Sequence, residues 1–211
     1  MEKAPKIQCV NVTKSYRDHT VLKQVNLECG SGEIAGIIGR NGAGKTVLFK
    51  AICGLTAIDS GEILIDGEKK SSGAILQSVG VIIEEPAFLA HTSGYKNLEY
   101  LYMIRNRVNR EHLNRVLSQV GLDPNSKKPV DKYSLGMRQR LAIAQVIMEN
   151  PDILILDEPF NGLDNQGVED MRTVFLGLKR LGKTILVASH NPEDIRLLCD
   201  RVYQMNAGVL E

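Results

Sequence analysis

The chain has 211 residues, of which 43% are hydrophobic and 24% are charged. This composition is typical of a globular domain and excludes a disordered chain, a collagen and a disulfide-stapled scaffold. With 26 Lys and Arg against 25 Asp and Glu, the formal net charge is +1. This argues against a protein that binds nucleic acid through a large excess of positive charge.

The termini and the cysteines indicate a cytoplasmic protein. The first residues, MEKAPKIQ, contain no apolar signal segment, and no stretch approaches the ~18 uninterrupted apolar residues of a membrane span. Cys9, Cys29, Cys53 and Cys199 form no C-x-x-C pair, so a zinc site or a redox pair is not expected. Free thiols suit a reducing compartment, and any work at a membrane would need a second chain that crosses it.

The first part of the chain reads as β-structure. Short apolar runs between residues 6 and 38 are separated by polar turns. The last run, 34–38, ends at Gly39, and a helical pattern (VLFKAICGL) begins at Val47. The predicted order is therefore strand, glycine-rich loop, helix.

That loop, GRNGAGKT at residues 39–46, matches the phosphate-loop pattern G-x-x-x-x-G-K-[ST]. Glycines let backbone N–H groups curl around phosphate oxygens, and the following helix points its positive dipole end at the anion. Lys45 is expected to reach the β- and γ-phosphates, and the Thr46 hydroxyl is expected to ligate Mg²⁺. A chance match in a chain of this length is roughly a 1-in-100 event, and its place between a strand and a helix lowers that further.

The middle of the chain changes from strands to helices. The dipeptide Asp66-Gly67 predicts a hairpin turn after EILI, and VGVII at 79–83 predicts a buried strand. From 93 to 148 apolar residues recur at helical spacing.

The charge is divided between neighbouring parts of the chain. Residues 101–150 hold 9 Lys and Arg and 4 Asp and Glu, a local charge of +5, whereas residues 151–200 hold 5 and 9, a local charge of −4. This division supports a distinct helical lobe. The arginines of the lobe are also explained by a solvated helix face.

After Pro151 strands and helices alternate. Continuous apolar strands that alternate with helices predict a largely parallel sheet covered on both faces. The expected elements are the strand ILIL, a helix marked by Val168, Met171, Phe175 and Leu178 and stopped by Gly182, the strand TILVAS, the helix PEDIRLLC and the strand RVYQM.

The strand ILIL runs into two acids, Asp157 and Glu158. Ligand sites in such sheets lie at the carboxyl ends of strands. Asp157 is expected to hold Mg²⁺ directly or through water. Glu158 points elsewhere, because strand neighbours alternate faces, and is free to accept a proton from an attacking water.

Together these motifs resemble the ATP-binding subunit of an ABC transporter over nearly the whole chain. The resemblance implies that Tyr16, in TKSYRDHTVL, stacks on adenine. It identifies VGVIIEEP as the Q-loop, YSLGMRQR from Tyr133 as the signature with its helix, NGLD as the D-loop, and His190 as the switch histidine that touches the γ-phosphate. Considered alone, a tyrosine such as Tyr16 is more often an aromatic packed at a strand end, and its assigned role rests on its place ahead of the phosphate loop.

The resemblance assigns three groups of site residues. Those implied to contact nucleotide are Tyr16, Val21, Gly39, Arg40, Asn41, Gly42, Ala43, Gly44, Lys45, Thr46, Val47, Ser134, Leu135, Gly136, Met137 and Asp164. Those implied in catalysis are Lys45, Glu158 and His190, and those implied in holding Mg²⁺ are Thr46, Glu84 and Asp157.

The chain departs from the family pattern at several positions. In the signature, Leu135 occupies the position of the family's second glycine and Met137 that of its final glutamine. Val47 follows the phosphate-loop threonine where a second hydroxyl residue is common, and Asn161 occupies the position of the D-loop serine. Glu84 occupies the position of the family's Q-loop glutamine. It either senses Mg²⁺ as that glutamine does, or it faces solvent while Glu85 or a water senses the metal instead. The segment VIIEEPAF is similar to the bacitracin- and lantibiotic-type export ATPases.

The resemblance implies an α/β, P-loop NTPase fold of the ABC ATPase type, with a mostly parallel sheet core, an N-terminal antiparallel β part and a helical lobe. The single domain, 1–211, would divide into a core of 1–84 and 151–211 and a lobe of about 85–150. The implied cofactors are ATP and Mg²⁺.

The implied function is ATP hydrolysis that powers a separate integral membrane permease, through a head-to-tail homodimer with nucleotides between the subunits. The protein would lie on the inner face of the cell membrane, and no nucleic-acid partner is expected. The sequence leaves open a second interpretation, an ABC-type ATPase that acts on nucleic acid or ribosomes, and a third, a regulatory module with negligible turnover, against which Glu158 argues.

Overall fold

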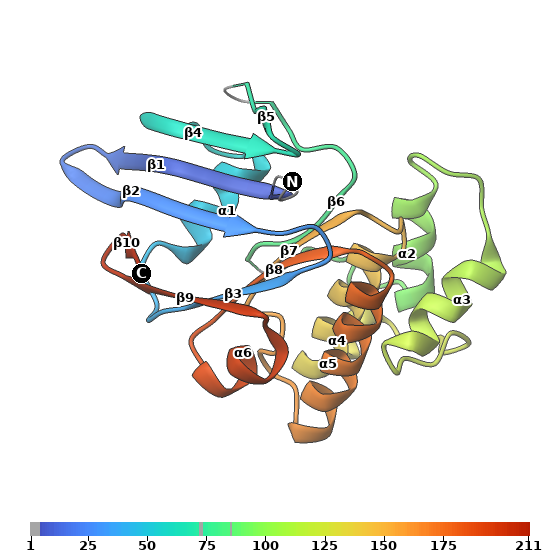
Figure 1. Ribbon diagram of the computed structural model, residues 1–211. Coiled ribbons are helices and arrows are strands. Elements are labelled where there is room, and N and C mark those ends of the chain that lie inside the picture. The colour runs from blue at the N-terminus through green and yellow to red at the C-terminus, as the bar shows by residue number, and fades with distance from the viewer. Residues whose placement is uncertain (1–4, 72–73, 85) are drawn as a thin grey trace.

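The computed structural model describes residues 5–71, 74–84 and 86–211. Two sheets face each other with helix α1 between them, and the remaining helices lie on the other side of the larger sheet (Figure 1). This arrangement agrees with the predicted α/β architecture.

The smaller sheet is the predicted N-terminal β part, and it is antiparallel throughout. The turn between its last two strands has positive φ at both Asp66 (54°) and Gly67 (78°), as a two-residue hairpin requires. Its strand order is β2-β1-β4-β5, with β1 at Ile7–Tyr16, β2 at His19–Cys29, β4 at Ser60–Ile65 and β5 at Glu68–Lys69.

The larger sheet contains five parallel strands and one short antiparallel edge strand. That edge strand, β10, was not predicted, because two residues are too few to carry a period-2 pattern. The strand order is β10-β9-β3-β8-β7-β6, with β3 at Ile34–Ile38, β6 at Val79–Ile82, β7 at Ile153–Asp157, β8 at Thr184–Ser189, β9 at Arg201–Asn206 and β10 at Val209–Leu210.

Strand β7 shows why the parallel strands read as continuous apolar runs. Ile153 and Ile155 pack in the core beneath α1, whereas Leu154 and Leu156 pack in the core beneath the other helices. Both faces of the strand are buried, so alternation with polar residues is lost. The alternation of faces leaves Asp157 on the side of α1.

Helix α1 (Lys45–Cys53) buries Leu48, Phe49 and Ile52 between the two sheets. It begins two residues before the predicted start at Val47. Gly44, at φ 115°, supplies a left-handed turn at the N-cap, which a side chain with a Cβ adopts only with strain. Lys45 and Thr46 therefore stand in the first helical turn.

The predicted helical region holds three α-helices and a 3₁₀ turn, and they share one core with β7. The side chains that fill it include Leu98, Leu113, Leu117 and Leu141. The elements are α2 at Gly94–Tyr102, α3 at Arg110–Gln119, η1 at Val130–Lys132 and α4 at Leu135–Ile147. The division into core and lobe at 85 and 150 stays a prediction.

Two more helices cover the larger sheet. Helix α5 (Asn165–Arg180) starts before the predicted apolar residues because the Asp164 side chain accepts a hydrogen bond from the Gly167 N–H at 2.8 Å and caps it. Helix α6 (Pro192–Leu198) begins with proline in its first turn, where the missing N–H costs nothing.

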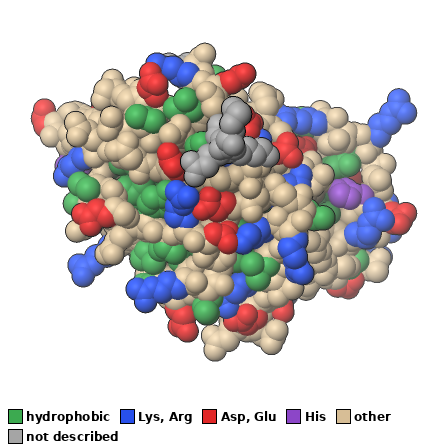
Figure 2. Space-filling model, viewed as in Figure 1, with side chains coloured by type: hydrophobic (Ala, Val, Ile, Leu, Met, Phe, Trp, Pro, Cys, Tyr) green, Lys and Arg blue, Asp and Glu red, His purple; other side chains and the backbone are tan. Residues whose placement is uncertain are grey.

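The distribution of charged side chains on the surface agrees with the near-neutral net charge of the chain. On the face shown in Figure 2, blue and red side chains are interspersed and neither sign dominates. Within the described residues, every helix is too short or too polar to cross a bilayer.

Candidate active site

A cavity of about 350 Å³ lies where β3 turns into α1. Its lining joins the phosphate loop to the end of β7 and to Val21 of β2, so the structure brings together residues that are far apart in the sequence. The lining residues are Val21, Arg40, Asn41, Gly42, Ala43, Gly44, Lys45, Thr46, Val47, Asp157 and Glu158.

Lys45 is the buried cation of this cavity. It is only 5% exposed, and its Nζ donates to the Gly39 carbonyl at 2.6 Å and to the Arg40 carbonyl at 3.4 Å. A buried ammonium is tolerated only when paired, and the loop backbone provides this pairing. The loop therefore holds a positive charge beside the backbone N–H groups at the start of α1, an arrangement that suits an anion.

Thr46 and Asp157 form an oxygen pair in the same cavity. The Thr46 hydroxyl donates to Asp157 Oδ2 at 2.5 Å. Burial raises the pKa of the Asp157 carboxyl, the hydrogen bond from Thr46 opposes this, and the nearby Glu158 carboxylate adds to the rise. A divalent cation at this point would relieve the cost of the buried charge.

Hydroxyl and carboxylate oxygens are hard ligands of the kind that Mg²⁺ prefers, and Mg²⁺ usually binds one or two protein ligands together with phosphates and waters. Thr46 and Asp157 fit that donor set. Among the residues that the structure describes, there is no cluster of three or more His, Cys, Asp or Glu that could hold a metal by protein ligands alone.

Glu158 stands between two cationic or proton-bearing groups. Its Oε1 lies 3.3 Å from Lys45 Nζ, and its Oε2 lies 2.9 Å from His190 Nδ1. The backbone of Glu158 is left-handed, with φ 51°, so the chain turns sharply after the strand. The structure thus brings the three residues predicted for catalysis into direct contact.

The signature and the D-loop line a second cavity of about 520 Å³, which shares none of its lining residues with the phosphate-loop cavity. Ser134 caps α4, where its hydroxyl accepts a hydrogen bond from the Met137 N–H at 3.2 Å. The predicted residues Ser134, Gly136, Met137 and Asp164 line this cavity. Leu135 is half exposed beside it and packs against Gly162.

Four further predicted site residues, Tyr16, Gly39, Glu84 and His190, lie outside the lining of the phosphate-loop cavity. Gly39 and His190 contact lining residues, through Lys45 and Glu158 respectively. Tyr16, at the end of β1, is 47% exposed; its hydroxyl lies 3.2 Å from Thr56 Oγ1, and Lys14 Nζ lies 5.2 Å from its ring centroid. Glu84, at φ 62°, places Oε1 2.6 Å from Lys50 Nζ. The alternative residue Glu85 is outside the described residues.

Sequence reasoning did not single out Lys50 or Gln139. The Glu84 carboxylate raises the pKa of the Lys50 ammonium by hydrogen bonding, and Tyr16 and Asp157 add to this by their charge. The available signal was the position of Lys50, one helical turn after Thr46. Gln139, in the signature helix, donates to the Pro159 carbonyl at 2.9 Å, a contact that no sequence pattern predicts.

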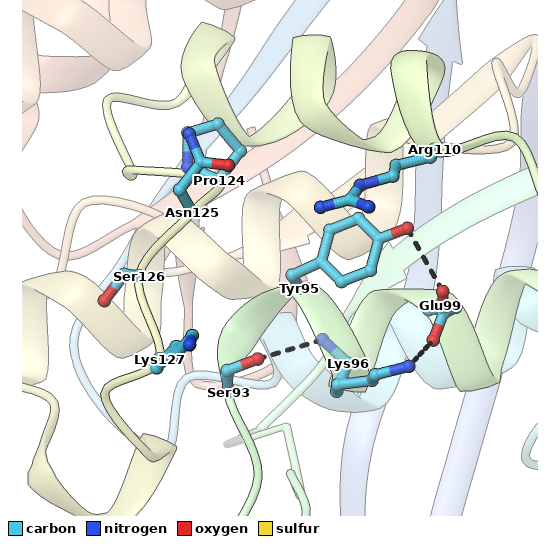
Figure 3. Close-up of a pocket in the computed structure, with 9 residues that line it drawn as sticks. All are labelled: Ser93, Tyr95, Lys96, Glu99, Arg110, Pro124, Asn125, Ser126 and Lys127. Carbon is cyan, nitrogen blue, oxygen red and sulfur yellow. Dashed lines mark hydrogen bonds and ion pairs between the residues drawn. The ribbon is translucent and has the colours of Figure 1, made fainter.

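A third hollow, of about 550 Å³, opens in the helical lobe between α2, the start of α3 and the loop at 124–127 (Figure 3). The Tyr95 hydroxyl donates to Glu99, Lys96 pairs with the same carboxylate, and the Arg110 guanidinium lies 6.0 Å from the Tyr95 ring centroid. Its lining includes neither the phosphate loop nor the acids Asp157 and Glu158.

Comparison with known proteins gives a consistent result. A family model described as ABC transporter matches residues 22–161. An uncharacterized ABC transporter ATP-binding protein of Bacillus subtilis, YybJ, is 41% identical over 97% of this chain and 94% of its own length.

Two further relatives carry functional names. The bacitracin transport ATP-binding protein BcrA of Enterococcus faecalis is 39% identical over 97% of this chain and 67% of its own length. The lantibiotic transport ATP-binding protein SrtF of Streptococcus pyogenes is 38% identical over 90% of this chain and 82% of its own length.

Among solved structures, the dimeric structure of MJ0796, a bacterial ABC transporter cassette, superposes with a TM-score of 0.86 at 25% identity, over 97% of this chain and 96% of that chain. The predicted fold and the predicted similarity to bacitracin and lantibiotic transport proteins are therefore confirmed.

Proposed function

Because the chain belongs to the ABC transporter family, as an ATP-binding and ATP-hydrolysing subunit, we propose that its phosphate-loop cavity hydrolyses Mg-ATP in a head-to-tail dimer that drives a membrane permease. The observation that carries this proposal is the position of the Glu158 carboxylate. It contacts both Lys45 and His190 at the wall of the phosphate-loop cavity.

Binding of the triphosphate uses the loop and Lys45. Backbone N–H groups of the loop and the N-terminus of α1 face the β-phosphate, and Lys45 reaches the β- and γ-phosphates. The Tyr16 ring offers a flat apolar face for adenine. One of its faces is occupied by Lys14, so the base would stack on the other.

Thr46 and Asp157 are the residues that would hold Mg²⁺. When bound, the ion neutralises phosphate charge and orients the γ-phosphoryl group. Glu84 is proposed to act at the edge of this site rather than within it, because its carboxylate pairs with Lys50.

Hydrolysis requires a water aligned with the γ-phosphorus. Glu158 accepts a proton from this water as the new oxygen–phosphorus bond forms. The bond between the γ-phosphorus and the bridging oxygen breaks, its electron pair stays on the β-phosphate, and the products are ADP and inorganic phosphate. During this transfer His190 contacts the γ-phosphate oxygens and stabilises the charge of the transition state.

The dimer follows from the two separate cavities. Each subunit has a complete phosphate loop, but its signature residues line another cavity. We propose that Ser134 and Gly136, at the N-terminus of α4, bind the γ-phosphate held by the partner subunit. A neighbouring positive helix end stabilises such an anion.

The proposals for the permease and the cargo are supported by the family and by the relatives. The chain is proposed to work on the inner face of the cell membrane, with residues 88–98 next to the permease. The hollow of Figure 3 is partly built by this segment, through Ser93, Tyr95 and Lys96. Relatives named for bacitracin and lantibiotic transport support a peptide antibiotic as cargo and export as its direction.

The test is purification of the tagged chain from membranes of its source cell in mild detergent. We expect a protein with several membrane-spanning helices to co-purify in stoichiometric amount, and we expect ATP hydrolysis that the variant Glu158→Gln lowers by ~10²–10⁴. Co-sedimentation with ribosomes that is lost on RNase treatment, without a membrane partner, would instead favour an ATPase that acts on nucleic acid.

A further inference from the structure

Helix α4, which carries the signature at its N-terminus, also hydrogen-bonds to the backbone next to Glu158, the proposed catalytic base of the same chain. Gln139 lies five residues after the cap Ser134 and is partly buried. Its Nε2 donates to the Pro159 carbonyl at 2.9 Å and lies 3.5 Å from the Glu158 carbonyl. Helix α4 is thereby joined through one side chain to the segment that directs Glu158.

That segment has an unusual conformation. Glu158 adopts φ 51°, a region that residues other than glycine rarely occupy and that persists only where the surroundings enforce it. Its N–H donates to the Ala188 carbonyl at 2.9 Å, and its carbonyl accepts from the Asn161 N–H at 3.2 Å. Among the described residues, Gln139 is the only side chain of another element that hydrogen-bonds to backbone carbonyls of this turn.

The first turn of α4 contacts the same segment further along. A Cβ on Gly136 would lie 2.9 Å from the Gly162 carbonyl oxygen, so the helix and the D-loop backbone are in close contact there. Leu135 packs over Gly162. A displacement of α4 therefore acts on both ends of the segment 158–163.

We propose that Gln139 is a positioning residue that couples occupancy of the signature site to the orientation of Glu158. The inference rests on the proposed function, in which the N-terminus of α4 binds the partner's nucleotide. When the partner's nucleotide binds, α4 moves, and the Gln139 amide transmits this movement to the Pro159 carbonyl. The backbone there determines the orientation of the Glu158 carboxylate, which contacts Lys45 and His190.

The experiment uses Gln139→Met, which keeps the length of the side chain and removes the donor, with Gln166→Met on α5 as matched control. Gln166 donates to Asp170 on the exposed face of its own helix. We expect Gln139→Met to lower kcat at least tenfold, while the ATP dissociation constant stays within twofold and the melting temperature matches the control. An unchanged kcat, or a loss that follows a lower melting temperature, would overturn the proposal.

A double-variant comparison separates action through Glu158 from a general role in packing. In the Glu158→Gln background, Gln139→Met should change the residual rate less than twofold, because effects that act through one group are not additive. A further tenfold loss in that background would contradict the proposal.

Hydrogen exchange gives a readout that does not need turnover. Gln139→Met should increase deuterium uptake in a peptide that covers 153–163 and leave the phosphate-loop peptide unchanged. If the parent chain fails to hydrolyse ATP, the proposed function fails, whereas unchanged uptake at 153–163 overturns the role of Gln139 by itself.

Discussion

Glu158 Oε2 lies 2.9 Å from His190 Nδ1, while the other carboxylate oxygen of Glu158 faces Lys45 at 3.3 Å. Lys45 and His190 are also the groups proposed to contact the γ-phosphate. The carboxylate proposed as the catalytic base thus contacts the same two groups that are proposed to bind the substrate. ATP binding must replace these contacts, which leaves Glu158 free to accept a proton.

Replacing His190 tests its part in this exchange. His190→Ala removes a group that is proposed to contact the γ-phosphate mainly as charge develops during transfer. We expect kcat to fall by about 10²-fold, while the ATP dissociation constant changes less than threefold. Steady-state hydrolysis and equilibrium nucleotide binding measure the two quantities. Full activity in the variant would show that His190 does not act at the reacting phosphate.

The proposed stacking of adenine on the Tyr16 ring can be tested by substitution of this tyrosine. Stacking beyond area burial contributes ~1 kcal/mol, so Tyr16→Ala should weaken ATP binding several-fold. Tyr100 is exposed to a similar extent on α2, and Tyr100→Ala serves as the control with no expected change. Equal dissociation constants for the parent and Tyr16→Ala would remove Tyr16 from the site.

Glu84 is the strongest departure from the Q-loop pattern, and its ion pair with Lys50 explains why a carboxylate is tolerated there. Two like unit charges 4 Å apart cost ~4 kcal/mol at an effective dielectric near 20, and Lys50 offsets part of this cost. We expect Glu84→Gln to leave Mg-ATP binding near that of the parent and to strengthen metal-free ATP binding about threefold.

Nucleotide titrations with Mg²⁺ and with EDTA measure this difference. Glu68→Gln, on the exposed strand β5, is the control for loss of a surface carboxylate. The same Mg²⁺ dependence in the parent and in Glu84→Gln would show that Glu84 does not act on the metal site.

The four cysteines give a prediction about thiol reactivity at pH 8. Burial raises the pKa of the Cys9, Cys29, Cys53 and Cys199 thiols to about 12. Because the thiolate is the reactive form, a raised pKa keeps all four protonated at pH 8. We expect negligible reaction with a thiol reagent in the folded chain at this pH and four reactive thiols after unfolding. Rapid modification of the folded chain would contradict the burial of Cys9, Cys29 and Cys53 and the partial burial of Cys199.

The sequence predicted the parts of the site whose chemistry is local. The phosphate-loop pattern of 39–46 lies in consecutive residues, and Asp157 ends an apolar run that predicted a buried strand, which the structure shows as β7. The strands and helices of the larger sheet were predicted for the same reason. Their boundaries moved where a cap decided the start, as Asp164 does for α5.

Contacts between distant elements could not be predicted. The pairing of Glu84 with Lys50 depends on how the chain after β6 returns to α1, and the bond from Gln139 to Pro159 depends on how α4 packs against the larger sheet. Neither leaves a periodic or compositional signal in the sequence. The left-handed backbone at Glu158 is likewise set by tertiary contacts rather than by local preference.

The most direct test is a comparison of ATP hydrolysis by the parent chain and by Glu158→Gln, which keeps the size of the side chain and removes the proton acceptor. The account predicts that ATP binding survives, that the rate falls by ~10²–10⁴, and that Mg-ATP converts the variant to a dimer in size-exclusion chromatography. Hydrolysis by the variant at the parent rate would contradict the assignment of Glu158 as the catalytic base.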